Sequence, residues 1–387
     1  MKLRKFLFLS AITLGFVACS DEDVPHSANG STDASISIKV YPASTGSQTR
    51  ATGDLKGDGV LSPGLVAESE IKQLEVWIFN GNALEKYASV TGSLEIKDIE
   101  VTSGARKLVV VANANLGTQA TLTALTALTK KLSQDISKGL VMTADPLDVA
   151  LVKGENFYGY PGTTTSEKNY ISTDPLALIR INARVAIVGA TLNLATPGAG
   201  EAQLFDGLTD AQVALFNVPE ITKLFGAELA QNSAYLFGQD WLSTSGSYMS
   251  GTLEQTLFEG AVNFPIVNTA APYFYVNENT AKTEQEQMLI VLRAKPTLSG
   301  VAVVAPGLYT DASGYTYYPV WVNAIKNGYS YNPDHTADSK IIRNTQYNIS
   351  LSVTGIGNPS IDPAETAFLD VKVVVKPWEV VNQQVIW

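Results

Sequence analysis

Short segments in which apolar and polar residues alternate recur along most of this chain. From residue 34 the sequence reads ASISIKVYP, which places Ile36, Ile38 and Val40 on one side of an extended strand that stops at a proline. Residues 71–81, IKQLEVWIFNG, alternate in the same way and end on an Asn-Gly pair that is typical of a hairpin turn. Because a side-chain period of two belongs to a half-buried strand, we expect a mostly β protein.

Composition supports this fold class and limits the partners. The 387 residues suffice for two domains, and 30 Gly with 17 Pro among 45% hydrophobic and 17% charged residues fit strands joined by turns. The formal net charge of -10 argues against nucleic acid, whose phosphates require concentrated Lys and Arg.

Two segments are expected to be helical. In residues 118–136 leucines recur every three or four positions, which predicts a helix packed over a sheet. Residues 209–216, TDAQVALF, are interpreted as a short capped helix. The long apolar run at residues 175–194 is expected to carry the chain from one domain to the next, with the boundary near Ala183.

The N-terminus has the form of a bacterial secretory signal of the lipoprotein kind. Basic residues precede an apolar run from Phe6 to Val17, and Ala18 stands directly before Cys19, the only cysteine of the chain. The apolar run is too short for a spanning helix of about 20 residues. We therefore expect export and acylation of Cys19, with a secreted protein carrying a spare thiol as the alternative.

Two further features stand at opposite ends of the chain. Arg50 lies in a segment of small, polar and glycine residues, and no other arginine occurs between Arg4 and Arg106. The chain closes on TAFLDVKVVVKPWEVVNQQVIW, two strand-like segments that flank Lys376-Pro377. An end this apolar is expected to be buried against something.

Catalytic and metal-binding patterns have little support. His335 has Asp334, Asp338 and Ser339 nearby, but close sequence neighbours seldom form a triad and no nucleophile elbow accompanies them. The segment GDLKGDG lacks the ligand register of a calcium loop, and the tyrosines between residues 315 and 331 are better explained as core than as a glycan platform. We expect no enzyme activity, no metal and no cofactor.

Several segments, in order along the whole chain, resemble the major fimbrillins of type V fimbriae. They are IKQLEVWIFNG, RKLVVVANAN, GLVMTADP, YYPVWVNAIKNGYSYN, KIIRNTQYNISLSVTG and VKPWEVVNQQVIW. The resemblance implies two transthyretin-like β-sandwich domains with a few short helices and a C-terminal donor-strand segment. It divides the chain into a signal peptide (1–18), a lipidated propeptide with the first strand (19–50), an N-terminal domain (51–183), a C-terminal domain (184–366) and donor strands (367–387).

The resemblance also implies a polymerisation switch. The precursor, held on the outer membrane by the lipid on Cys19, would be cut between Arg50 and Ala51 by an arginine-specific protease. The strand carrying Ile36, Ile38 and Val40 would leave, and a second copy would fill its groove in a head-to-tail surface filament that supports adhesion. The donor residues would be Leu369, Val371, Val373, Val375, Trp378, Val380, Ile386 and Trp387.

Other partners and other functions stay open at this point. The resemblance implies anchor and tip subunits, and host proteins or other bacteria as further contacts. The chain could instead be a monomeric surface lipoprotein that binds a glycan or a host protein. It could also be an anchor or tip subunit, although the combination of Arg50 with an apolar tail favours the stalk.

Overall fold

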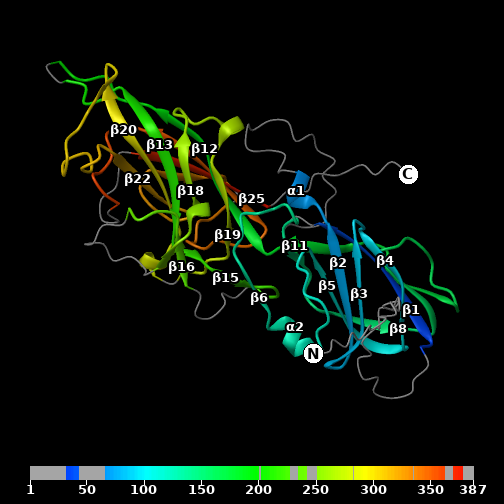
Figure 1. Cartoon of the computed structure of the whole chain (residues 1–387). Helices are drawn as coiled ribbons and strands as arrows, with labels where there is room; N and C mark the ends of the chain where they lie inside the picture. The colour runs from blue at the N-terminus through cyan, green and yellow to red at the C-terminus, as the bar shows by residue number, and fades with distance from the viewer. Residues whose placement is uncertain are drawn as a thin grey trace, which may run out of the picture.

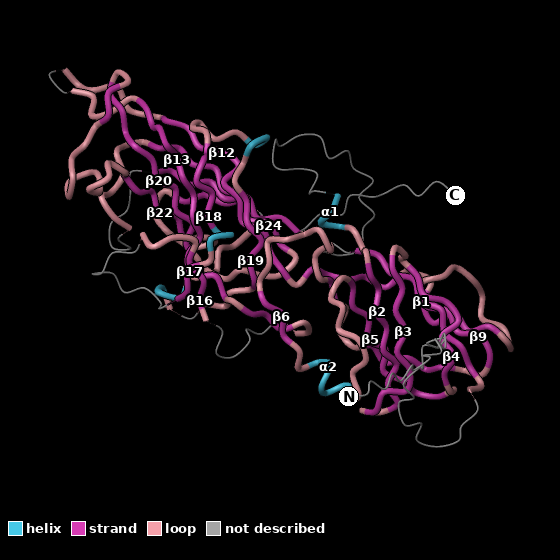
Figure 2. Tube along the Cα trace, in the orientation of Figure 1, coloured by secondary structure: helices cyan, strands magenta, loops and turns pink. Residues whose placement is uncertain are grey.

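Two β-rich lobes lie end to end in the computed structural model (Figure 1). This model describes residues 32–42, 66–199, 202–226, 234–241, 251–281, 283–333, 335–361 and 369–377, with only the backbone for residues 66 and 375–377. Strands make up most of this described part (Figure 2), which confirms the expected mostly β fold. The transthyretin-like topology stays a prediction.

Helices are short throughout the described ranges. The α-helices are α1 (Val66–Ser69) and α2 (Leu122–Thr126), and single 3-10 turns occupy Gln255–Leu257, Asn268–Ala270 and Glu284–Glu286. None of these helices has the length and apolar character needed to cross a bilayer.

The N-terminal lobe is built on a ten-stranded sheet whose main path runs β10-β9-β1-β11-β7-β5-β2-β3. In addition, β4 pairs with β1 and β8 pairs with β5. The strands are β1 (Ala34–Pro42), β2 (Gln73–Asn80), β3 (Ala83–Thr91), β4 (Glu95–Val101), β5 (Gly104–Ala112), β7 (Met142–Thr143), β8 (Leu147–Leu151), β9 (Gly154–Tyr158), β10 (Lys168–Ser172) and β11 (Leu176–Arg180).

The pair β2 and β5 is buried on both faces. On one face Leu74, Val76 and Val110 pack in the core shared with β1, and on the other Trp77 and Val111 belong to a core shared with α2. The hairpin predicted at the end of residues 71–81 is confirmed, since β2 and β3 pair antiparallel around the Asn-Gly turn.

The C-terminal lobe contains two five-stranded sheets. One has the order β19-β12-β24-β25-β23, and its strands are β12 (Asn182–Leu192), β19 (Tyr273–Asn277), β23 (Tyr329–Tyr331), β24 (Thr345–Val353) and β25 (Leu369–Pro377). The other has the order β18-β13-β20-β21 with β22 paired to β20, and its strands are β13 (Gly207–Phe216), β18 (Phe258–Val262), β20 (Leu289–Leu298), β21 (Val301–Ala302) and β22 (Thr316–Trp321).

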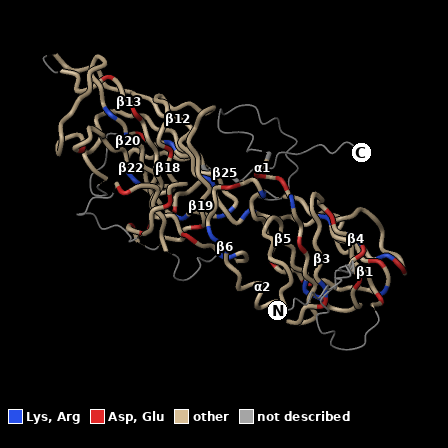
Figure 3. Tube along the Cα trace, viewed as in Figure 1, with Lys and Arg blue, Asp and Glu red and all other residues tan. Residues whose placement is uncertain are grey.

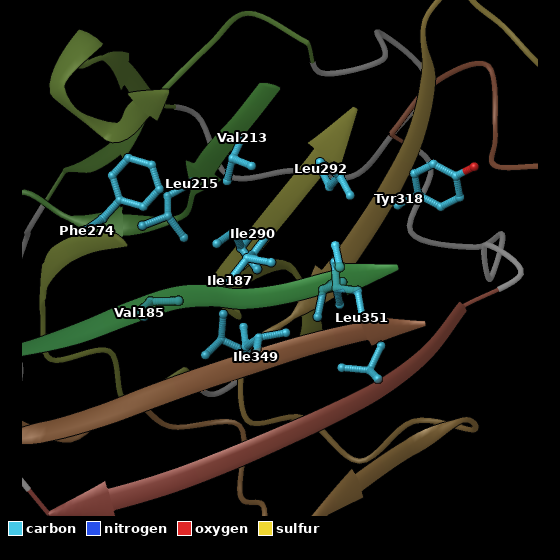
Figure 4. Packing of buried hydrophobic residues seen from close by; sticks show 14 of the residues in the cluster. Val185, Ile187, Val213, Leu215, Phe274, Ile290, Leu292, Tyr318, Ile349 and Leu351 are labelled. Carbon is cyan, nitrogen blue, oxygen red and sulfur yellow. The ribbon is translucent and has the colours of Figure 1, made fainter. Parts of the chain in front are cut away.

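Side chains of these two sheets meet in one core (Figure 4). Ile187 and Ile349 from one sheet face Leu215 and Ile290 from the other, and none of the four is exposed. Small sheets complete the lobe and join it to the rest: β14 (Val218–Pro219), β16 (Tyr235–Phe237), β17 (Gly251–Leu253), and the pair of β15 (Ile221–Lys223) with β6 (Thr129–Lys131).

The chain changes sheets between β11 and β12, with Ile181 between them. β11 belongs to the N-terminal sheet and β12 to the C-terminal one, while β6 and β15 pair across the two parts of the sequence. The exact domain limits remain predictions.

Of the two helix predictions, the one for residues 118–136 is wrong in part and the one for residues 209–216 is wrong. In residues 118–136 only α2 is helical, because Thr129–Lys131 pairs with β15 and β-branched threonines favour extended backbone. Residues 209–216 form strand β13, hydrogen-bonded to both β18 and β20. Val213 and Leu215 enter one core and Phe216 another, so burial on both faces hid the alternation.

Candidate functional site

Strand β1 fills a groove in the N-terminal lobe with three apolar side chains. Ile36 and Ile38 have no exposed surface and Val40 has 1%. These are the three residues whose period-two spacing predicted a buried face. Their neighbours in this core come from several strands and include Leu74, Val76, Ile96, Ile99, Val110 and Leu178.

The backbone of β1 is paired along its whole length. Residues 34–39 pair antiparallel with β4, with a register shift between Ile36 and Ile38. Residues 34–38 also pair parallel with β9, and residues 40–42 pair parallel with β11. Removal of β1 would therefore leave unpaired backbone groups on three strands as well as an apolar groove.

Polar contacts hold the beginning of β1. Asp33 accepts hydrogen bonds from the Ser103 amide at 2.7 Å and the Ser103 hydroxyl at 3.0 Å, and these bonds lower the pKa of the Asp33 carboxyl. The buried amide of Asn156 donates to the Ser35 carbonyl at 3.0 Å. Neither contact could be predicted from the sequence, because Asp33 and Ser103 are 70 residues apart and Asn156 and Ser35 are 121 residues apart.

The end of β1 and the start of α1 lie beside the same strand. Pro42 is opposite Leu178 of β11, and two residues further along β11 Arg180 Nε donates to the Glu68 carbonyl at 2.8 Å. Two strand residues span about 7 Å. Pro42 and Glu68, the described residues that hold the chain on either side of segment 43–65, are thus both bound to β11. Arg50, Ala51 and Cys19 lie outside the described residues.

Strand β25 belongs to the C-terminal lobe's own sheet. It pairs antiparallel with β24 over all nine residues and parallel with β23 over three. Val371 and Val373 are buried in the core and Leu369 packs against it. The backbone of Val375 lies opposite Tyr347. The remaining predicted donor residues, Trp378, Val380, Ile386 and Trp387, lie outside the described residues.

Other candidate chemistry does not assemble in the described part of the chain. His335 Nε2 lies 2.6 Å from Asn323 Oδ1 and burial lowers the pKa of the imidazole, so the ring packs in a loop. Acidic and basic residues are interspersed over both lobes (Figure 3). No group of three potential metal ligands occurs there.

A buried polar cluster at the junction of the lobes was missed. Arg184 Nη1 lies 2.8 Å from Glu68 Oε1, and both side chains are at most 1% exposed. The sequence offered one signal, because Arg180 and Arg184 interrupt an otherwise apolar strand run. Their partners are too distant in sequence to be identified from it.

Comparison with known proteins identifies the family. The family model described as "Major fimbrial subunit protein (FimA)" matches residues 34–180, and that of the "FimA4 pilin C-terminal domain" matches residues 203–378. The chain is 31% identical to both the major fimbrium subunit FimA type-2 and type-4 of Porphyromonas gingivalis, with 100% of each chain covered.

A solved structure agrees with these matches. The crystal structure of a fimbrilin (fimA) from Porphyromonas gingivalis W83 is 30% identical and superposes with a TM-score of 0.73, covering 91% of this chain and 99% of that one. The relatives are named as subunits of a fimbrium and not as enzymes. The chain therefore belongs to the family of major fimbrial subunit proteins.

Proposed function

We propose that this protein is a structural subunit of a fimbrial stalk that polymerises when β1 is replaced by a strand from a second copy. The observation that carries the proposal is the burial of Ile36, Ile38 and Val40 in a strand joined to the next described residue only through segment 43–65. A cut after Arg50 would leave β1 held by non-covalent contacts alone.

The vacated groove is a strong binding site for an extended peptide. Burying three such side chains contributes about 1.5 to 3 kcal/mol each, or about 5 to 9 kcal/mol before ordering costs. The open edges of β4, β9 and β11 add main-chain hydrogen bonds, as in other strand-addition complexes. An apolar peptide with a period of two satisfies both requirements.

The C-terminal segment of another copy is the occupant that fits. Two parts of it place apolar residues on one face at a spacing of two. They are residues 369–375 and the tail 378–387, where Trp378, Val380 and Ile386 share a face with Asn382 and Gln384. Because Val371 and Val373 already fill the C-terminal core, donation of β25 would open that core. We favour the tail, whose ten residues reach about 33 Å when extended and match the nine residues of β1.

Pro377 suits a division between a strand that stays and a tail that is donated. Its ring carries no N–H to continue the ladder, and it is opposite Thr345, the first residue of β24. Since groove and tail are different surfaces, each subunit accepts one strand and donates another. This heterologous contact propagates into an open head-to-tail filament.

The lipoprotein-type N-terminus and the family resemblance together support the following setting for the filament. The precursor is exported and attached to the outer membrane through lipid, in part palmitate, on Cys19. An arginine-specific protease then releases it. Anchor and tip subunits occupy the filament ends, and the cell-surface fimbrium contributes to adhesion and virulence through host proteins or other bacteria.

The test is cleavage of the purified, unlipidated precursor, beginning at Ser20, by an arginine-specific protease. We expect new N-termini at Ala51 together with SDS-resistant ladders. Arg50→Gln should abolish both products, whereas deletion of residues 378–387 should allow the cut and abolish the ladders. Fibres that retain residues 20–50, or ladders formed by uncut Arg50→Gln protein, would contradict the proposal.

A further inference from the structure

The short helix α1 lies at the junction of the two lobes, close to β11 (Figure 1). It is held there by Glu68, whose side chain has no exposed surface. One carboxylate oxygen of Glu68 lies 2.8 Å from Arg184 Nη1 of β12 and accepts a hydrogen bond of 2.8 Å from the hydroxyl of Tyr275 in β19. Both partners come from the C-terminal lobe.

Arg180 of β11 holds the same helix from the N-terminal lobe. Its guanidinium donates to the Glu68 carbonyl and to the Ser69 hydroxyl, both at 2.8 Å, and to the Asn344 side chain at 2.9 Å. Asn344 immediately precedes β24. The helix is therefore fixed by side chains of both lobes at once.

At neutral pH, Arg180 and Tyr275 are in the protonation states that their contacts with Glu68 require. Burial lowers the pKa of Arg180 to about 10, which leaves the guanidinium charged. Burial and the neighbouring Glu68 carboxylate raise the pKa of Tyr275, so its hydroxyl stays a donor. Breaking a buried charge pair is strongly unfavourable, because the remaining partner is left without compensation.

The position of α1 in the chain determines what this cluster would hold in place after cleavage. Residues 43–65 separate α1 from β1, and β2 starts four residues after Ser69. Ile71 and Leu74 lie in the core that β1 covers. After a cut in segment 43–65, α1 is thus the first described element of the chain that remains.

We propose that the contacts of Glu68 with Arg180, Arg184 and Tyr275 form a junction anchor that keeps the wall of the groove in place when β1 leaves. A new chain end normally frays, and fraying here would reach Ile71 and Leu74. The anchor stops it before those residues. The groove therefore stays open and shaped for the incoming strand.

This inference rests on the proposed function only in that β1 departs after a cut in segment 43–65. Its test uses a cut that is independent of Arg50. The recognition sequence of an unrelated protease is inserted after residue 55, and amide hydrogen exchange is followed by mass spectrometry before and after cutting. The peptides of interest cover residues 66–72 and 34–42.

In the wild-type background we expect residues 66–72 to stay protected after the cut, while residues 34–42 exchange faster. Glu68→Gln should speed exchange at residues 66–72 by about tenfold or more in the cut form, as expected for loss of a hydrogen-bonded charge. Glu70→Gln is the matched control, because the Glu70 side chain is 43% exposed and its carboxylate lies 3.3 Å from Lys72, away from the Glu68 cluster. It should change little.

Tyr275→Phe removes a single hydroxyl and guards against a Glu68 variant that fails to fold. It should produce a smaller increase in the same peptide. Equal exchange of residues 66–72 in the wild type and both anchor variants after cutting would overturn the anchor. Failure of the native cut at Arg50 would refute the proposed processing and leave this comparison valid.

Discussion

Strands β1 and β25 have nearly the same local pattern and different places in the molecule. Each is nine residues long and directs alternate apolar side chains into a core. The long partner of β25 is antiparallel β24, whereas β1 is parallel to both β9 and β11 and antiparallel only to β4. Parallel pairing is slightly less stable per residue.

The comparison teaches that an alternating pattern predicts which side chains are buried. It does not predict whether the strand stays in its sheet during assembly. β1 precedes the rest of the described chain and connects to it only through segment 43–65, so one cut detaches it. β25 has a continuous antiparallel partner, and its valines complete the core of its own lobe. We therefore expect β1 to be exchanged and β25 to stay.

The largest expected effect comes from locking each strand to its neighbour. Ser35 and Glu100 lie opposite each other in β1 and β4, and neither is buried. Opposite residues have Cβ atoms about 4.5 to 5.5 Å apart, near the range of a disulfide. Ser35→Cys with Glu100→Cys in the chain beginning at Ser20, oxidised and then cut, should form no ladders until a reductant is added.

The matched lock joins β25 to β24 through Ser350→Cys with Lys372→Cys, another opposite pair outside the core. The oxidised protein should form ladders as the wild type does, because the disulfide does not involve the proposed donor residues 378–387. Mass spectrometry confirms each disulfide before the assembly assay. Arrest by the β25 lock would show that residues 369–375 are donated.

An effect of intermediate size is expected on stability. Core substitutions in the two strands should differ in whether they weaken the filament as well as the precursor. Ile38→Ala deletes fully buried atoms and should destabilise the uncut precursor by about 2 to 5 kcal/mol in urea unfolding. Filaments from the same variant should dissociate at the wild-type urea concentration, because β1 is no longer present.

Val373→Ala supplies the contrast in β25. It should destabilise the precursor by about 2 kcal/mol and also lower the urea concentration at which filaments dissociate, because Val373 stays in the C-terminal core. If Ile38→Ala weakened the filaments, β1 would still be present in them. If Val373→Ala left the filaments unchanged, β25 would not be part of their core. Either result would contradict the expectation that β1 is exchanged and β25 stays.

The sequence allowed strands to be predicted where the alternation or the turn is clear. β1 alternates, and β2, although buried on both faces, ends on the Asn-Gly turn that marks its hairpin with β3; both are confirmed. β13 lacks a clear alternation, because Val213, Phe216 and their neighbours are buried on both faces, and a Thr-Asp start suggested a helix cap. Sheet pairing overrode the helical leucine spacing after Thr126.

The site could be predicted only where it is local in sequence. The buried face of β1 follows from three residues spaced by two. The contacts of Asp33 with Ser103 and of Glu68 with Tyr275 join residues 70 and 207 positions apart. Such contacts depend on the packing of the lobes, which no local pattern encodes.

The smallest expected effect is a pH dependence of the contacts that hold the start of β1. Among its described contacts, β25 has no carboxylate contact like that of Asp33 with Ser103. The Ser103 hydrogen bonds lower the pKa of Asp33 below its ordinary value of 3.8. A lowered folded-state pKa means that the stabilisation is complete above pH 3.8 and is lost as pH falls through the folded-state value. Hydrogen exchange in residues 34–42 of the uncut precursor should therefore accelerate more than exchange in β25 does as the pH falls below 3.8, after correction for intrinsic rates.

Asp33→Asn should remove most of that extra pH dependence, because the amide still accepts from Ser103 but does not titrate in this range. Asp148→Asn is the control, since Asp148 is an exposed carboxylate whose ion-pair partner is Lys107 of β5 and not a residue at the start of β1. It should leave the pH response of β1 unchanged. If both variants behaved alike, the response would come from the overall charge of the protein, and Asp33 would have no special part in holding the strand that is exchanged.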